Sequence, residues 1–404
     1  MSLTPINEAL DQLAPLLPLI DETESVPLSE ASGRVLAEDC VSGIDVPGHC
    51  NSAMDGYAVR STDLGAENNQ LRVTQRIAAG EVGGQLDPGE AARIFTGAAV
   101  PSGADAVVMQ ENCETSGDAL TVLQQKVQPG DNLRQAGDDI RAGTMILAQG
   151  HRLKPQDLGL LASIGLETVS VRRRLRVSLL TTGDELVQPG TELRVGQIYN
   201  SNYYTLRSLL EGLQVEVLDC GIVEDDFEST RQALVEAAAK SDCVITTGGV
   251  SVGEEDHVKA VIEQEGELQL WKLAIKPGKP LACGKIAKIQ FFGLPGNPVS
   301  AFVTFVLVVR PCLLRMLGAK RLASCSYRVA AGFVAGESGE RQEYLRCTLT
   351  QDAELGATAQ PLRNQSSGVA ASLSQADGLC IVPPYTTVSI GDSLEFIPFS
   401  ELLN

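Results

Sequence analysis

Histidine is scarce in this chain of 404 residues, which contains only His49, His151 and His257. Ten cysteines are present, but no two of them form a C-x-x-C pair, and several lie inside apolar runs. A zinc site needs clustered nitrogen and sulfur ligands, so the sequence argues against one. The scattered cysteines are typical of small buried thiols in a reducing compartment.

A targeting segment and a membrane span are also missing. The first residues, MSLTPINEALDQL, have neither a basic start nor the apolar stretch of a signal peptide. The longest apolar run, residues 299–309, is too short to span a bilayer and ends at Arg310-Pro311, so we expect a buried helix. With 44% hydrophobic and 21% charged residues, the composition is that of a globular protein. The sequence therefore predicts a cytoplasmic protein that does not use a membrane.

Basic residues are outnumbered, because 32 Lys and Arg face 51 Asp and Glu, a formal net charge of −19. A charge of this sign argues against nucleic acid and anionic membranes as partners. The distribution is uneven, since residues 268–336 contain no Asp or Glu but ten Lys or Arg. This segment either pairs with acidic neighbours across an interface or forms a local anion site. Three lysines around one short Gly/Pro turn favour the anion site.

The chain is too long for one ordinary core, and its patterns predict an α/β multidomain protein. Residues 176–317 alternate strand and helix signals, which predicts a mostly parallel sheet with helices on both faces. Residues 42–142 and 325–404 contain short strands between Gly, Pro and Asp turns, and the first of these regions has an antiparallel β pattern. We expect an N-terminal helix at 1–22, a linking domain at 23–41 and 143–173, a β-rich domain at 42–142, an α/β domain at 174–324 and a C-terminal β domain at 325–404.

Acidic turns follow three strands of the α/β region, in TTGDEL, VEDD and TTGGVSVGEED. Parallel strands end at the same edge of a sheet, where open α/β sheets bind ligands. Carboxylates with open water positions suit Mg²⁺, which bridges to substrate phosphate. Glu185, Asp225 and Asp256 are therefore candidate metal ligands. The alternative is that acids after strands are helix caps, which fits Asp226 well.

The same edge offers groups that suit an anion. Lys272, Lys276 and Lys279 surround a tight turn in WKLAIKPGKP, and ammonium groups bind phosphate or other oxyanions. The turn in GLPGNPVSA precedes the apolar helix and offers a free helix N-terminus, and TTGG presents backbone N–H groups after a strand. Each feature alone is also compatible with an exposed loop or a plain helix start. Together they predict a cation held between the acids and an anionic ligand.

Three glycine turns of the first β region contain Asp55 in MDG, Thr96 in FTG, and Asp138-Asp139 in AGDD. Asp, Thr and Gly are ordinary turn residues. The residues alone therefore predict loops, with a catalytic role only if these loops face the α/β cleft.

Seven ordered motifs, NSAMDGYAVR, FTGAAVP, AGDDI, TTGDEL, TTGGVSVGEEDHVK, KLAIKPGKP and GLPGNPVS, together resemble the molybdopterin molybdenumtransferases. This family comprises the bacterial molybdenum insertases and includes the C-terminal domain of gephyrin. The resemblance, which covers nearly the whole chain, implies an elongated four-domain homodimer with each active site between protomers. It implies insertion of molybdenum from molybdate into adenylylated molybdopterin, with Mg²⁺ present and AMP released. The adenylyltransferase of the same pathway is the implied partner.

The resemblance also implies residue roles. Its catalytic acids are Asp55, Asp139, Glu185, Asp225 and Asp256, and the last three would bind the metal. Its substrate-binding groups are Thr96, Gly248, Gly249, Ser251, Lys272, Lys276, Lys279, Pro295, Pro298, Arg346 and Ser367. Arg346 and Ser367 match less closely because the spacing there is looser. Asp138 stands where the family often has Glu, which keeps the charge but shortens the side chain.

Two other functions fit parts of this pattern. An adenylyltransferase that makes the adenylylated intermediate needs only a compact α/β domain, so the two β regions would be unnecessary. A gephyrin-like scaffold with residual catalysis need not keep the acids and lysines. We therefore expect molybdenum insertion, without a covalent protein intermediate because no nucleophile–base pair is apparent.

Overall fold

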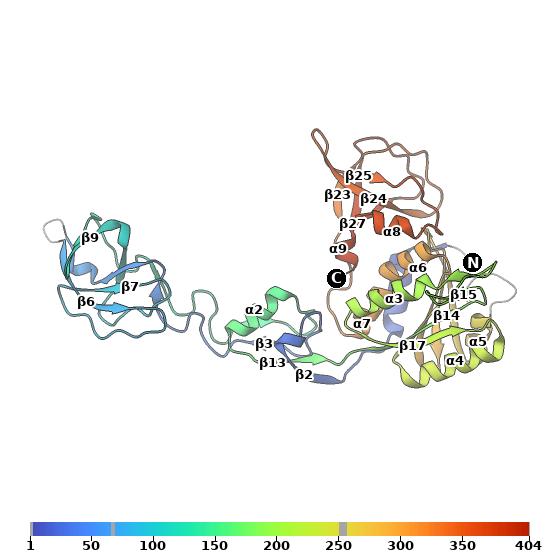
Figure 1. The fold of residues 1–404 in the computed structure, drawn as a ribbon, viewed down its shortest axis with the longest axis horizontal. Coiled ribbons are helices and arrows are strands. Elements are labelled where there is room, and N and C mark those ends of the chain that lie inside the picture. The colour runs from blue at the N-terminus through green and yellow to red at the C-terminus, as the bar shows by residue number, and fades with distance from the viewer. Residues whose placement is uncertain (1–2, 66–68, 250–256, 404) are drawn as a thin grey trace. The chain divides into compact units, whose positions relative to one another are not determined.

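The computed structural model, drawn as a ribbon in Figure 1, describes residues 3–65, 69–249 and 257–403. The chain divides into two compact units. The main unit comprises Met1–Glu38, Gly150–Lys154 and Thr168–Asn404. The inserted unit comprises Asp39–Gln149 and Pro155–Glu167. Each unit has its own buried hydrophobic clusters, as expected for a chain of this length.

A seven-stranded sheet forms the centre of the main unit. Its order is β1 (Leu3–Thr4), β19 (Gly266–Leu273), β21 (Pro280–Ile286), β22 (Ile289–Leu294), β18 (Cys243–Thr247), β14 (Arg176–Thr182) and β17 (Glu216–Val223). Strands β22, β18, β14 and β17 are parallel, with Leu179 opposite both Ile245 and Asp219. Strand β21 runs antiparallel to both of its neighbours. The prediction of a mostly parallel sheet is confirmed.

Helices cover both faces of this sheet (Figure 1). On one face, α4 (Phe227–Lys240) and α5 (His257–Glu265) bury a cluster that includes Leu234 and Phe291. On the other face lie α1 (Ile6–Leu13), α3 (Ser201–Gly212) and a long helix built from α6 (Pro298–Thr304), η5 (Phe305–Val309) and α7 (Arg310–Met316).

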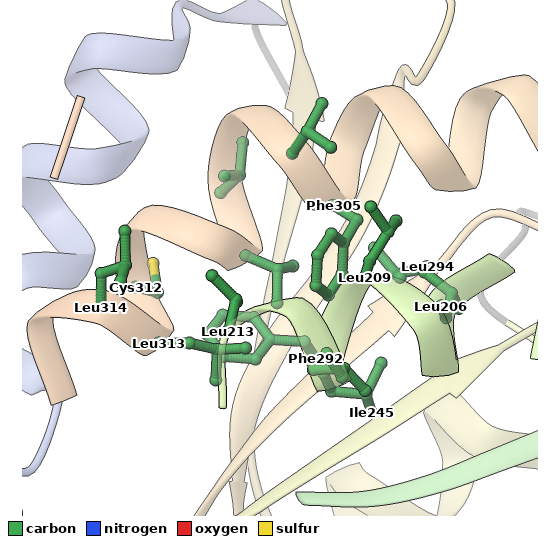
Figure 2. Close-up of a cluster of buried hydrophobic side chains, with 14 of the residues drawn as sticks. Leu206, Leu209, Leu213, Ile245, Phe292, Leu294, Phe305, Cys312, Leu313 and Leu314 are labelled. Atoms are coloured by element: carbon green, nitrogen blue, oxygen red, sulfur yellow. The ribbon is translucent and has the colours of Figure 1, made fainter. Parts of the chain in front are cut away.

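The larger core lies between α3, the long helix and the sheet. Figure 2 shows Leu206 and Leu209 of α3 beside Phe305 of the long helix, with Ile245 and Phe292 of the sheet close by. Burying each such side chain contributes about 1.5–3 kcal/mol. This packing fixes the strands whose ends carry the candidate site.

The long helix, Pro298–Met316, confirms the expected buried helix. Its length and composition would allow it to cross a membrane. However, 83% of its most apolar 18-residue stretch is buried inside the protein. The segment η5 is a π-type turn just before Pro311. Proline lacks an N–H group and its ring crowds the carbonyl four residues earlier, so a widened turn accommodates it.

The C-terminal strands form a small closed barrel. The order is β24 (Gln342–Asp352), β25 (Gly356–Pro361), β23 (Tyr327–Ala331), β27 (Ser393–Pro398) and β26 (Gly378–Val382), and β26 pairs again with β24. Strand β20 (Ile275–Lys276) pairs with β24 from outside. Tyr344, Leu379 and Ile397 of the barrel belong to the larger core of the main unit. The expected small β domain is therefore present.

The inserted unit contains a six-stranded sheet. Its order is β8 (Ala106–Met109), β5 (Gly56–Val59), β7 (Glu90–Ile94), β6 (Gln70–Ile77), β10 (Ala119–Val122) and β9 (Cys113–Ser116). The expected antiparallel pattern is wrong for one pair, because β6 and β7 run parallel. Twelve residues (78–89) join these two strands, which is enough chain for the return that a parallel pair needs.

The remaining elements are short. In the main unit they are η1 (Ala14–Leu16), β2 (Thr23–Pro27), η2 (Leu28–Glu30), β13 (Thr168–Arg172), β15 (Leu186–Val187), β16 (Ile198–Tyr199), α8 (Ala371–Gln375) and α9 (Phe399–Leu402). In the inserted unit they are β3 (Cys40–Val41), β4 (Asn51–Ser52), η3 (Ser61–Asp63), η4 (Gln110–Asn112), β11 (Leu133–Arg134), β12 (Met145–Leu147) and α2 (Pro155–Ser163).

All ten cysteines lie in the described part of the chain and are free, and six of them are buried. Burial raises the pKa of the Cys312 thiol to about 12, which keeps it protonated and unreactive at neutral pH. These observations fit the expectation of small buried thiols.

Candidate active site

The carboxyl edge of the main sheet brings three strand ends into direct contact. Gly248 follows β18 with φ +94°, and a Cβ atom there would lie 2.7 Å from the carbonyl oxygen of Thr182 at the end of β14. The backbone N–H of Gly248 donates to the carbonyl of Leu294, at the end of β22, at 3.2 Å. Glycine is therefore required where these strands meet.

Asn202, in the first turn of α3, ties two loops of this edge together. Its Nδ2 donates to Oγ1 of Thr247 at 2.9 Å and to the carbonyl oxygen of Gly296 at 2.7 Å. The Thr247 hydroxyl donates to the carbonyl of Pro295 at 3.2 Å. Asn202 thus holds the turn that contains Pro295 against the end of β18. No sequence motif singled out Asn202, although its place at a helix start after a strand could have pointed to it.

The acidic turns that follow β14 and β17 are joined directly. The backbone N–H of Asp225 donates to Oδ1 of Asp184 at 3.0 Å. The carboxylate of Glu185 folds back over Gly183, since a Cβ atom at that glycine would lie 2.5 Å from Oε2. Glu185 is exposed and Asp225 is half-buried, so both carboxylates are accessible to solvent. The loops that carry them are joined by the hydrogen bond between Asp225 and Asp184.

Asp226 is a helix cap, as its sequence context predicts. Its side chain accepts a hydrogen bond from the backbone N–H of Ser229 in the first turn of α4 at 3.0 Å. Hydrogen bonds from the side chain and then the backbone of Ser229 lower the pKa of Asp226.

Two of the expected site residues, Ser251 and Asp256, lie outside the described residues. Within residues 3–65, 69–249 and 257–403, no group of three His, Cys, Asp or Glu side chains is close enough to hold a metal. Mg²⁺ needs only one or two protein carboxylates when substrate phosphates and waters complete its shell. The donor chemistry of Glu185 and Asp225 fits that requirement.

The predicted lysine turn packs on the long helix. A Cβ atom at Gly278 would lie 2.6 Å from Oγ1 of Thr304 in α6, which holds the turn closely against that helix. Lys279 is exposed, and Lys272 is half-buried in β19. Lys276 forms an ion pair with Glu343 of the barrel, with Nζ and Oε1 2.9 Å apart. Pairing with an acidic neighbour therefore accounts for Lys276.

The start of α6 is less free than expected. The N–H of Val299 donates to the carbonyl oxygen of Ser367 at 3.0 Å. Beneath this loop lies Arg346, which is 1% exposed and donates to Oγ of Ser372 at 3.2 Å and to the carbonyl of Ser366 at 3.1 Å. Burial lowers the pKa of Arg346. Arg346 thus holds the loop of Ser367 from below, next to Pro298 at the first position of α6.

In the inserted unit, Asp55 and Thr96 lie together. The Oδ1 atom of Asp55 accepts from both the backbone N–H and the hydroxyl of Thr96, each at 2.8 Å. These two hydrogen bonds lower the pKa of Asp55, and the charge of Arg93 lowers it further. Asp139 lines a separate polar hollow of about 480 Å³ whose walls include Arg141 and Leu160.

Three family profiles match successive parts of the chain. The MoeA N-terminal region (domain I and II) matches residues 4–165, a probable molybdopterin binding domain matches residues 178–315, and the MoeA C-terminal region (domain IV) matches residues 335–399.

Similar proteins carry consistent names. The chain is 44% identical over 317 residues to a molybdopterin molybdenumtransferase from Haemophilus influenzae, covering 78% of each chain. It is 35% identical over 381 residues to one from Nostoc sp., covering 92% of this chain and 87% of that one. Gephyrin from Dictyostelium discoideum is 31% identical, covering 95% and 60%. The molybdopterin biosynthesis moeA protein from Pyrococcus horikoshii OT3 has a similar structure, with TM-score 0.83, 31% identity and coverage of 98% and 100%.

Proposed function

Since the chain belongs to the molybdopterin molybdenumtransferase family, we propose that it inserts molybdenum from molybdate into adenylylated molybdopterin and releases AMP. One observation supports this proposal at the level of residues. The acidic turns, a glycine turn and the turn before α6 all lie at one edge of the sheet. The lysine turn packs on α6 itself. Acids and lysines at ends of strands of the same sheet suit two anionic substrates that must be held together.

Charge and position supply the chemistry in this proposal. The exposed ammonium group of Lys279, with that of Lys272, holds phosphate or molybdate oxygens as a point charge, and Lys276 would join them on leaving its ion pair with Glu343. Glu185 and Asp225, with Asp256, would hold Mg²⁺, which offsets phosphate charge when it is bound. Asn202 and Arg346 keep the loops of Pro295 and Ser367 in place through the hydrogen bonds described above.

In the inserted unit, Asp55, Thr96 and Asp139 complete the proposed set of substrate-facing residues. Gly248 and Gly249 let the turn after β18 approach the ligand closely, as their positive φ values require glycine. Ser251 belongs to the same turn in sequence.

We also propose that the protein acts in the cytoplasm as a homodimer, because the family resemblance implies a dimer. An adenylyltransferase must supply its substrate, since the substrate carries an adenylyl group that this chain removes. Light scattering of the purified protein would give twice the mass of 42.8 kDa expected for one chain. A monomer under conditions of full activity would contradict the dimer.

The direct test is to incubate the purified protein with adenylylated molybdopterin, molybdate and Mg²⁺ and to measure AMP. We expect Asp225→Asn and Lys279→Gln to lower kcat/KM by about tenfold or more without changing the free energy of unfolding by more than about 0.5 kcal/mol. Lys288→Gln is the matched control, since Lys288 is an exposed lysine of the same basic segment in a distant hairpin loop. Near-normal turnover of both site variants would contradict the proposed roles.

The same assay distinguishes the rival functions. An adenylyltransferase would consume ATP and molybdopterin and produce pyrophosphate. A gephyrin-like scaffold with residual catalysis would release AMP from the adenylylated substrate only slowly.

A further inference from the structure

Two arginines lie side by side in a unit that is strongly acidic. The inserted unit has 17 Asp and Glu but only seven Lys and Arg. In its sheet, Arg93 of β7 lies opposite Arg76 of β6, and opposite Tyr57 of β5 on the other side. Like charges placed directly opposite one another on neighbouring strands are destabilising. The pair therefore needs a compensating interaction.

Aromatic rings hold both guanidinium groups. The Cζ atom of Arg76 lies 4.6 Å from the centroid of the Phe95 ring, and that of Arg93 lies 4.7 Å from the same centroid. The Arg93 Cζ atom is also 5.1 Å from the centroid of Tyr57. Each contact of this kind contributes about 0.5–1 kcal/mol at an exposed site. The rings fix the guanidinium groups but do not cancel their charge.

The hydrogen-bond partners of Arg93 are neutral. It donates from Nη1 to the carbonyl of Gly56 at 3.0 Å and from Nη2 to Oε1 of Gln110 at 2.6 Å. Among the described residues, neither Arg76 nor Arg93 forms an ion pair, and the charge of Arg93 acts on Asp55, whose carboxylate accepts hydrogen bonds from Thr96.

Two other arginines of the same unit, Arg72 and Arg60, form ion pairs. Arg72, on the same strand as Arg76, pairs with Glu90 at 2.9 Å, and Arg60 lies 3.6 Å from Asp63. The unit thus has enough acids to pair its arginines, and it pairs those two. Arg76 is exposed and Arg93 half-buried, so their positive charge is open to solvent.

We propose that Arg76 and Arg93 form a binding site for a phosphate-type oxyanion, with Phe95 and Tyr57 holding the guanidinium groups in place. A planar guanidinium offers paired N–H donors that match two oxygens of such an anion, and two arginines stacked on one ring bring two positive charges to a doubly charged one. Phe95 directly precedes Thr96, so the site adjoins the turn assigned to the substrate. The inference rests on the proposed function in this respect, because its substrates carry phosphate and molybdate.

Chemical modification of arginine tests the site without turnover. The full-length protein is treated with phenylglyoxal, alone and with AMP, inorganic phosphate, molybdate or adenosine, and modification is mapped by peptide mass spectrometry. At an anion concentration about ten times its Kd, we expect modification of Arg76 and Arg93 to slow by about tenfold. Arg72 is the internal control and should react at the same rate throughout.

The four ligands separate the sources of the anion. Protection by AMP and phosphate alone assigns the site to a nucleotide phosphate, and protection by molybdate at lower concentration assigns it to the metal oxyanion. Adenosine should give no protection. Equal rates with and without every anion would overturn the proposal, as would protection by adenosine equal to that by AMP.

Kinetics link the site to the reaction. Arg76→Gln and Arg93→Gln should raise KM for the adenylylated substrate about tenfold with kcat within about twofold, whereas Arg72→Gln should change neither. Arg76 is exposed, so its variant tests the site even if Arg93→Gln disturbs the sheet. Unchanged KM in Arg76→Gln would overturn the role in the reaction. If anions protect Arg76 and Arg93 from modification but the protein releases no AMP, the anion site is supported and the proposed function is contradicted.

Discussion

Single polar side chains hold the loops of the candidate site, and Asn202 is the clearest of them. Its two hydrogen bonds join α3 to the end of β18 at Thr247 and to the turn at Gly296. A side chain that makes both bonds fixes the distance between the loops, which sets where Pro295 lies. Such a residue acts on the reaction through position, without touching the reacting atoms.

Replacing Asn202 by Ala should therefore affect both stability and catalysis. Two lost hydrogen bonds should lower the free energy of unfolding by about 1–3 kcal/mol. Displacement of the Pro295 turn should lower kcat/KM for AMP release by about tenfold. Asn69→Ala is the control, because the side chain of Asn69 donates one hydrogen bond, to the carbonyl of Val122 at 3.2 Å, away from the site. Normal kcat/KM per folded molecule in Asn202→Ala would show that the residue is only structural.

Asp242 gives the main unit a pH dependence at the opposite, amino-terminal edge of the sheet. It accepts hydrogen bonds from Arg173 at 2.7 and 3.0 Å and from the backbone N–H of Arg176 at 2.8 Å. Burial raises the pKa of Asp242, but the hydrogen bonds from these arginines outweigh it, so the pKa lies below its ordinary 3.8. The folded state therefore binds this proton less readily than the unfolded state.

A depressed folded-state pKa contributes stability that is present above about pH 4 and lost as the pH falls through that pKa. Asp242→Asn should lower the free energy of unfolding by about 1–2 kcal/mol at pH 7, since the carboxylate is partly screened by solvent. The difference between wild type and variant should become smaller as the pH falls below about 4 towards the lowered pKa of Asp242. Urea unfolding between pH 3 and pH 7 measures it, and a difference independent of pH would contradict the assignment.

At the scale of elements, local patterns predicted much of the architecture. The alternation of strands and helices over residues 176–317 and the acidic turns after β14 and β17 follow from periodicity and turn residues. The parallel pairing of β6 with β7, the strand β25 and the closure of the barrel between β24 and β26 do not. These features depend on which distant strands pair, and the alternation of side chains within one strand carries no information about its partner.

The candidate site shows the same division. Asp225 and Glu185 could be singled out because acids after parallel strands meet at one edge. The roles of Asn202 and of the Arg76–Arg93 pair depend on neighbours far away in sequence, so their own residue types gave no signal. Arg346 could be named but not understood, because its burial beneath the loop of Ser367 is a tertiary property.

The hairpin between β21 and β22 offers a prediction at this scale. Ala287 and Lys288 form its two-residue loop with φ +47° and +74°, and Ile286 pairs with Ile289. A loop with positive φ at both positions favours glycine at the second. Lys288→Gly should therefore raise the free energy of unfolding by about 0.5–1 kcal/mol.

Urea unfolding checks this hairpin prediction. Lys288→Gln, which keeps a side chain at the same position, separates the backbone effect from the loss of charge. If the free energy of unfolding of Lys288→Gly is lower than that of Lys288→Gln, the assignment of the turn is wrong.

At the scale of the whole molecule, each of the two units has a hydrophobic core of its own. Ile94, Ile77 and Val107 belong to a core of the inserted unit, whereas Ile245 and Phe292 belong to the core of the main unit. Separate cores allow separate unfolding transitions, as is common in multidomain proteins.

Matched substitutions can test this independence. Ile94 and Ile245 are both strand isoleucines with 0% exposure, so Ile94→Ala and Ile245→Ala remove the same atoms from the two cores. Each should destabilise its own unit by about 2–5 kcal/mol through lost burial and the cavity left behind. Calorimetry should show one transition lowered in Ile94→Ala and the other in Ile245→Ala, while the second transition stays in place. If both variants lower a single shared transition, the two units unfold as one cooperative body. In that case changes in the inserted unit, including those at Arg76, must be compared at equal folded fraction before their kinetics are interpreted.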